Sequence, residues 1–316
     1  MHYLYNHLRS CPLDSSYTPA TQFRESPDFD LKFPPLPRTV AEVTSMIADS
    51  KESPNTPRLA EVVRADPIIA SFVLRRVNSA HYGLRRSVDD VHQAVVLLGF
   101  DEVCNITLTA GMMRLKEVVA SKEQASIFYE IMKSSIGAAF FAKELAAHLT
   151  LPLHSKAFIV GLQHAVGRLV LLYNRPDDYE ALWFTCKDNV GPPPSDERKI
   201  FGIDHAELGG LAIEYWELPV LISELIRFYI TPMHLNEQDL RTLGLVLSVA
   251  VSVTEQLCLN FRQGGDAARL SQDFFVPPTD LYLLGKMEGI TPGDLIKLLR
   301  ATLKPACNYI ETMVHG

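Results

Sequence analysis

The feature that most constrains the fold is the spacing of the apolar residues, which recur every three or four positions through most of the chain. Between 125 and 148 this spacing is carried by Phe128, Ile131, Met132, Ala138, Ala139, Ala142 and Leu145. It is the spacing of a helix that buries one face, whereas a half-buried strand would alternate apolar and polar residues. We find no such alternation in the segments we can assign, so the sequence predicts an all-α fold.

Helix boundaries follow from residues that start or stop helices. Asp66-Pro67 and Asp204 are helix starts, because an aspartate accepts hydrogen bonds from the free backbone N–H groups of a first turn. Ser87 to Asp90 has the form of a capping box and is expected to open a helix that ends at Gly99, after which Asp101 caps the next one. The stretch from 157 to 173 is expected to form one buried helix, ended by Pro176.

Composition excludes several classes of protein. A net charge of -7 over 316 residues argues against general binding to nucleic acids or to anionic membranes. The longest uncharged apolar stretch, Thr242 to Thr254, has 13 residues, while a spanning helix needs roughly 20. The chain opens on nothing that resembles a secretory signal, and its five cysteines show no CxxC spacing. We therefore expect a soluble cytoplasmic protein with reduced thiols and no membrane span.

His164 is the polar exception within the buried 157 to 173 stretch. A histidine followed by an aspartate could hold a divalent metal that activates water against a phosphodiester. Residue 165 is alanine, which cannot ligate a metal, so only half of such a pair is present.

Several motifs in a fixed order resemble the HDOD domain, the HD-related output domain of bacterial signalling proteins. The matching motifs are the proline-rich Phe33 to Pro37, Asp66-Pro67, Asn78 to Gly83, Ala94 to Phe100, Phe201 to Gly209 and Trp216 to Pro219. This resemblance covers about residues 30 to 260. It implies an N-terminal helical bundle packed on a half related to the HD metal-dependent phosphohydrolases.

The same resemblance implies a division of the chain. We expect a loosely ordered N-terminal arm over 1–30 and an N-terminal helical subdomain over 31–120. A degenerate HD-like helical subdomain is expected over 121–262, followed by a C-terminal helical extension over 263–316.

The resemblance also implies that the metal site is broken. HD hydrolases use a histidine on the preceding helix, the His-Asp pair and a later aspartate. Those positions correspond here to Ser134, His164 with Ala165, and Val251, so only His164 is a ligand. One neutral ligand cannot hold a catalytic divalent ion. We therefore expect no catalytic residues, no bound metal, no cofactor and no enzyme activity.

Other polar residues could belong to the vestigial HD cavity. Arg168 lies one helical turn after His164 and could bind an anion there, or form a salt bridge. His205 and Tyr229 could face the same cavity, or serve as a helix-start hydrogen bond and as core packing, and His164 itself could be a satisfied core histidine. Separately, a patch of Arg75, Arg76, Arg85 and Arg86 could bind an anion or an acidic partner, or be a solvated face.

Three functional hypotheses remain open at this stage. The favoured one is a non-catalytic signalling or scaffold protein that binds protein partners of a bacterial regulatory pathway. The second is a sensor that binds a nucleotide in the vestigial cavity without cleaving it. The third is a phosphohydrolase with unconventional metal ligands. The oligomeric state is not predicted.

Overall fold

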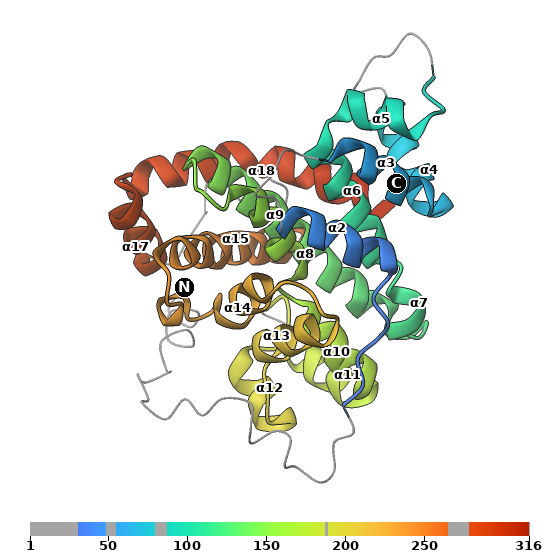
Figure 1. Ribbon diagram of the computed structural model, residues 1–316. Coiled ribbons are helices and arrows are strands. Elements are labelled where there is room, and N and C mark those ends of the chain that lie inside the picture. The colour runs from blue at the N-terminus through green and yellow to red at the C-terminus, as the bar shows by residue number, and fades with distance from the viewer. Residues whose placement is uncertain (1–30, 49–54, 80–86, 187–188, 265–277, 316) are drawn as a thin grey trace. The chain divides into compact units, whose positions relative to one another are not determined.

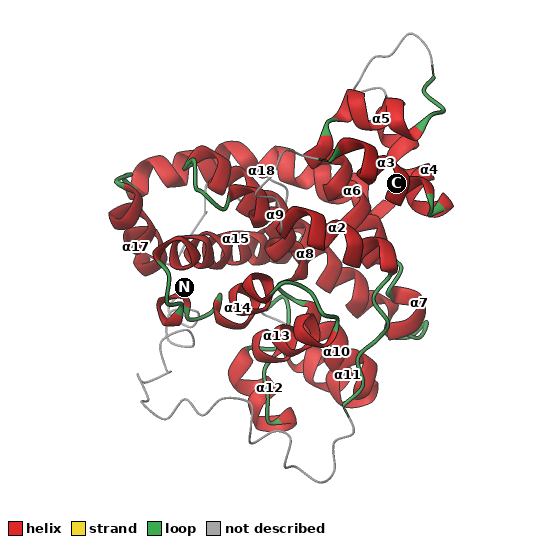
Figure 2. Cartoon of the chain, viewed as in Figure 1, coloured by secondary structure: helices red, strands yellow, loops and turns green. Residues whose placement is uncertain are grey.

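The computed structural model describes residues 31–48, 55–79, 87–186, 189–264 and 278–315, and every regular element among them is helical (Figures 1 and 2). The all-α prediction is therefore confirmed. The predicted N-terminal arm over 1–30 lies outside the described residues.

The N-terminal helices pack around α6 (Phe100–Met113). Its neighbours are α2 (Arg38–Ala48), α3 (Thr56–Arg64), α4 (Pro67–Val77) and α5 (Val91–Leu98). The short α7 (Lys116–Val119) then leads to the longer helices that follow.

The core of the remaining chain is built around α8 (Ala125–His148), whose bounds match the predicted helix. Packed along α8 are α9 (His154–Gln163), α15 (Gln238–Arg262) and α18 (Pro292–His315). The other helices are α10 (Val166–Asn174), α11 (Pro176–Thr185), α12 (Pro194–Phe201), α13 (His205–Tyr215), α14 (Val220–Phe228), the 3-10 turn η3 (Pro232–His234) and α17 (Pro278–Glu288).

The aspartate helix starts are partly as predicted. The Asp66 carboxylate accepts from the backbone N–H groups of Ile68 and Ile69, as expected of a cap. The predicted cap at Asp101 is wrong, because α6 begins one residue earlier and Gly99 is its N-cap residue. Gly99 ends α5 with a φ of 86°, a conformation that favours glycine, so the chain turns into α6 without a polar cap.

Replacing Asp66 tests its double role as cap and ion-pair partner, because its carboxylate also lies 2.5 Å from Nη1 of Arg114. We expect Asp66→Ala to lower the free energy of unfolding by about 1–2 kcal/mol, measured by urea denaturation. Asp66→Asn keeps a capping oxygen but loses the charge, and should fall between the wild type and the alanine variant. An asparagine variant as unstable as the alanine variant would contradict the capping role.

The predicted helix over 157–173 is interrupted. It divides into α9 and α10, with a turn at His164 and Ala165. Nδ1 of His164 lies 2.7 Å from the carbonyl oxygen of Gly161, which would accept the N–H of residue 165 in a continuous helix. The imidazole takes the place of that backbone hydrogen bond, so the helix is interrupted at the residue that the sequence singled out.

Two segments are long and apolar enough to cross a membrane, contrary to the expectation drawn from the 13-residue stretch. They are His154–Asn174, which comprises α9 and α10, and Gln238–Arg262. However, 94% and 72% of their apolar windows are buried inside the fold. Their hydrophobicity is accounted for by the packing of α9 and α15 against α8 and of α10 against α13.

Candidate functional site

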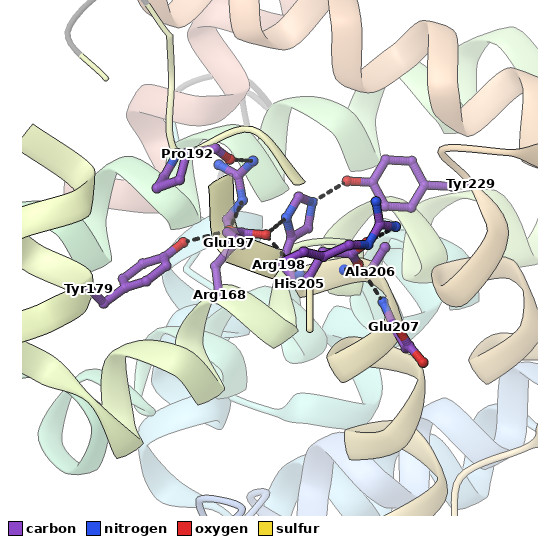
Figure 3. A network of polar contacts seen from close by, with 10 residues as sticks. Arg168, Tyr179, Pro192, Glu197, Arg198, His205, Ala206, Glu207 and Tyr229 are labelled. Carbon is purple, nitrogen blue, oxygen red and sulfur yellow. Dashed lines mark hydrogen bonds and ion pairs between the residues drawn. The ribbon is translucent and has the colours of Figure 1, made fainter. Parts of the chain in front are cut away.

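A buried carboxylate, Glu197 on α12, is the centre of a polar network (Figure 3). Tyr179 Oη donates to its Oε1 at 3.2 Å, and the backbone N–H of His205 donates to its Oε2 at 2.8 Å. Nδ1 of His205 lies 2.5 Å from the same Oε2. Nε of Arg168 forms an ion pair with Oε1 at 3.9 Å. Both oxygens of the carboxylate are therefore occupied by groups from three other segments.

The start of α13 positions His205. Asp204 caps this helix through the N–H groups of Ala206 and Glu207 at 2.9 Å and is ion-paired with Arg198, which confirms the predicted helix start. The imidazole of His205 thereby lies between Glu197 and Tyr229, whose Oη is 2.7 Å from Nε2. Carboxylate, imidazole and phenol form one chain of hydrogen bonds.

The Arg168 side chain is covered by the loop before α12. Nη2 donates to the carbonyl oxygen of Pro192 at 3.3 Å, and the side chain is 9% exposed. A Cβ atom at position 191 would overlap Nη1, so Gly191 lets the loop close over the guanidinium. The predicted proximity of Arg168 to a carboxylate is thus present, and the partner is Glu197.

The charges of the network follow from burial and from the neighbouring groups. Burial raises the pKa of Glu197, but His205 and then Arg168 outweigh it, so that the pKa lies below its usual range. Burial raises the pKa of Glu255 on α15, and burial together with nearby carboxylates raises the pKa of Tyr229, which keeps that phenol protonated. Glu197 and Arg168 therefore form a charged pair inside the protein.

His164 lies beside this network but is not hydrogen-bonded to it. Its ring meets that of Tyr229 edge to face, with centroids 5.5 Å apart. Because a carbonyl oxygen only accepts, Nδ1 carries the proton that is donated to Gly161. Burial lowers the pKa of His164 to about 3, so the ring is neutral.

The neutral His164 predicts a pH dependence of stability. Its pKa is about 3 in the folded protein and about 6.5 in the unfolded chain, so between these values the unfolded chain binds more protons. Stability from this group is therefore complete above pH ~6.5 and declines as the pH falls, by about 2 kcal/mol from pH 8 to pH 5.

Urea denaturation of the wild type and of His164→Asn at several pH values checks this. Asparagine keeps an N–H donor for Gly161 but does not titrate. The stability advantage of the wild type over the variant should shrink by about 2 kcal/mol towards pH 5. Parallel pH profiles for the two proteins would contradict a buried neutral imidazole.

The positions corresponding to the other hydrolase ligands are apolar or lie outside the network. Ser134 on α8, Ala165 and Val251 on α15 are all buried. Among the described residues, no hydrogen bond joins Ser134 to His164, and no group of three or more His, Cys, Asp or Glu side chains is arranged to hold a metal.

The structure brings together Arg168, His205 and Tyr229, which the sequence proposed for one cavity. It adds Glu197, Tyr179 and Asp204, of which sequence reasoning missed the first two. One signal for Glu197 was available, because it lies one turn before the buried Phe201 on an otherwise polar helix. That spacing places the carboxylate on the inward face.

The arginine patch is only partly described. Arg76 pairs with Glu102 at 3.5 Å, whereas the guanidinium of Arg75 lies 4.4 Å from the ring centre of Phe72. Arg85 and Arg86 lie outside the described residues.

Comparison with known proteins gives the family. Residues 33–232 match the HDOD domain, which is more than half of the chain. The chain belongs to the HDOD domain family, and the resemblance deduced from its motifs is confirmed.

Individual relatives are distant. An uncharacterised protein of Treponema pallidum is 24% identical over 209 residues, which cover 65% of this chain and 39% of that protein. This chain spans two fifths or less of the length of the curated relatives it matches.

Several solved structures share the fold, among them the following two. An HDOD domain protein of unknown function from Geobacter sulfurreducens has a TM-score of 0.69 at 16% identity, covering 89% of this chain and 93% of that one. A protein of Marinobacter aquaeolei, whose name assigns it provisionally to signal transduction, has a TM-score of 0.61 at 19% identity. The match covers 90% of this chain and 60% of that one.

Proposed function

We propose that this chain is a non-catalytic signalling protein that acts by binding other proteins in a bacterial regulatory pathway. Membership of the HDOD family supports the signalling role, as does the name of the Marinobacter structure. The absence of catalysis is supported by the chemistry of the former metal site. The protein acts in the cytoplasm, in keeping with its thiols and charge.

The observation that carries the proposal is the replacement of ligands by groups that cannot ligate or that are already bonded. Ala165 and Val251 offer no donor atom. His205 bonds to Glu197 and Tyr229, and Arg168 donates from Nη2 to the carbonyl oxygen of Pro192. Nε of Arg168 is ion-paired with Glu197 at 3.9 Å but forms no hydrogen bond within the described part of the chain. A hydrolase must direct such groups at a metal-bound water or at the phosphate, whereas here they stabilise the interior.

The test is a hydrolysis assay. The purified chain, incubated with Mn²⁺ or Fe²⁺ and cyclic dinucleotides, should release product no faster than metal and buffer alone. His164→Ala serves as the control for a contaminating hydrolase. Turnover that the wild type shows and His164→Ala loses would overturn the proposal, and would favour the hypothesis of an unconventional metal site.

A nucleotide sensor is the alternative from the sequence, and the geometry supports it less. Two described grooves, of about 480 and 670 Å³, are lined by residues of the N-terminal helices and the start of α8. Arg168, the cation that would bind phosphate, donates a hydrogen bond to the carbonyl oxygen of Pro192 and forms an ion pair with Glu197. A thermal-shift screen with mono- and cyclic nucleotides should show no stabilisation, since a ligand of the native state raises apparent stability.

A further inference from the structure

A groove of about 670 Å³ lies where the N-terminal helices meet the start of α8. Its walls come from α4, α6, α7, the residues that join α7 to α8 and the start of α8, and include Phe72, Met113, Lys116, Glu117, Lys122 and Tyr129. Phe72, Met113 and Tyr129 are partly exposed and give the groove an apolar and aromatic floor.

Two cations that line this groove, Lys116 and Lys122, and a third beside it, Arg75, form no ion pair among the described residues, although Glu117 also lines the groove. Nζ of Lys116 lies 3.0 Å from Tyr129 Oη and 4.8 Å from the centre of its ring. Arg75 lies over Phe72 in the same way, and Lys122 is exposed. None of the three has a carboxylate within 4.0 Å among the described residues.

Neighbouring cations behave differently. Arg114, which also lines the groove, pairs with Asp66, and Arg76 pairs with Glu102. The chain has a net charge of -7, whereas these unpaired cations beside aromatic rings make the surface locally positive. Such a surface attracts acidic groups while repulsion elsewhere disfavours general anion binding.

We propose that this groove binds an acidic, apolar-containing peptide segment of a partner protein. The three cations come from separate segments, and Arg75 and Lys116 lie over different aromatic rings, those of Phe72 and Tyr129. Positive charge is therefore spread along the groove rather than concentrated at one point. An amphipathic peptide helix with several carboxylates matches such an arrangement, and its apolar side chains cover Phe72, Met113 and Tyr129. This inference rests on the proposed function, because it assigns the partner-binding surface of a non-catalytic protein.

The experiment uses the full chain and a fluorescein-labelled peptide of glutamate and leucine, with the leucines at helical spacing. Binding is followed by fluorescence anisotropy. The wild type should bind the peptide, and affinity should fall when salt is raised from about 0.05 to 0.3 M. The double variant Arg75→Glu/Lys122→Glu should bind at least about tenfold more weakly.

The matched control is Lys286→Glu/Lys304→Glu, which makes the same change of charge at exposed cations on α17 and α18. It should bind within about twofold of the wild type. Thermal denaturation verifies that both double variants are folded.

Three results would overturn the inference. The wild type could fail to bind the peptide, both double variants could lose peptide affinity equally, or free ATP could displace the labelled peptide as well as unlabelled peptide does. The last would make the groove a site for small anions. These failures leave the proposed function intact, whereas metal-dependent hydrolysis would overturn the proposed function without changing how the peptide binds.

Discussion

Replacing Glu197 by alanine is expected to lower the free energy of unfolding by about 3–5 kcal/mol, because removing one partner of a buried ion pair leaves the other charge uncompensated. The uncompensated group is Arg168, which stays covered by the Gly191-Pro192 loop. The same substitution removes the acceptor of Tyr179 and of both His205 groups. Denaturation in urea, monitored by circular dichroism, measures the loss.

The adjacent residue provides a matched control. Asp196 pairs with Lys199 on the surface, with side chains 36% and 75% exposed. Asp196→Ala should therefore change stability by no more than about 0.5 kcal/mol. A similar small effect for both alanine variants would show that the buried pair is not a stabilising element of the native state.

A double variant isolates the pair itself. Arg168→Met/Glu197→Gln removes both charges, so its cost should be smaller than the sum of the two single substitutions. Additive costs would mean that the two side chains act independently.

Gly167→Ala is expected to lower the free energy of unfolding by about 3 kcal/mol, at the upper end of the range for overpacking. A Cβ at this position would overlap the backbone carbonyl of His205 and lie 2.7 Å from the backbone N of Gly209. Backbone atoms cannot rotate away as a side chain can, so α10 and α13 must move apart. That movement would also shift His205 from Glu197.

The control for this prediction adds the same methyl group where there is space. Gly293 lies in the first turn of α18, and its only close neighbour is Oγ1 of Thr291 at 3.8 Å. Gly293→Ala should be neutral or stabilising by up to about 1 kcal/mol. Urea denaturation of both variants checks the difference, and equal effects would exclude a role for close helix contact.

Periodic spacing predicted the helices well where packing follows one face. The bounds of α8 and the caps at Asp66 and Asp204 came directly from residue spacing and capping chemistry. The break between α9 and α10 could not be predicted in that way. It depends on a side-chain hydrogen bond from His164 to Gly161 inside an apolar run, and periodicity does not register such a bond.

The candidate site was predicted only in part, for a related reason. His164, Arg168, His205 and Tyr229 attracted notice because polar groups in apolar segments need partners. Glu197, the partner of Arg168 and His205, lies on a helix with many charged residues, where only its spacing to the buried Phe201 distinguishes it from the exposed carboxylates. The sequence also could not predict that the Gly191-Pro192 loop covers the guanidinium.

The packing of α15 and α18 along α8 bears on how this chain can be trimmed for experiments. The family match stops at residue 232, yet both of these helices bury apolar side chains beyond that limit, including Leu243, Val246, Leu299 and Leu303. A fragment that ends at residue 232 would expose the apolar side chains of α8 that α15 and α18 now cover. Expression fragments should therefore retain the last helix, since the evolutionary unit and the folding unit of this chain have different ends.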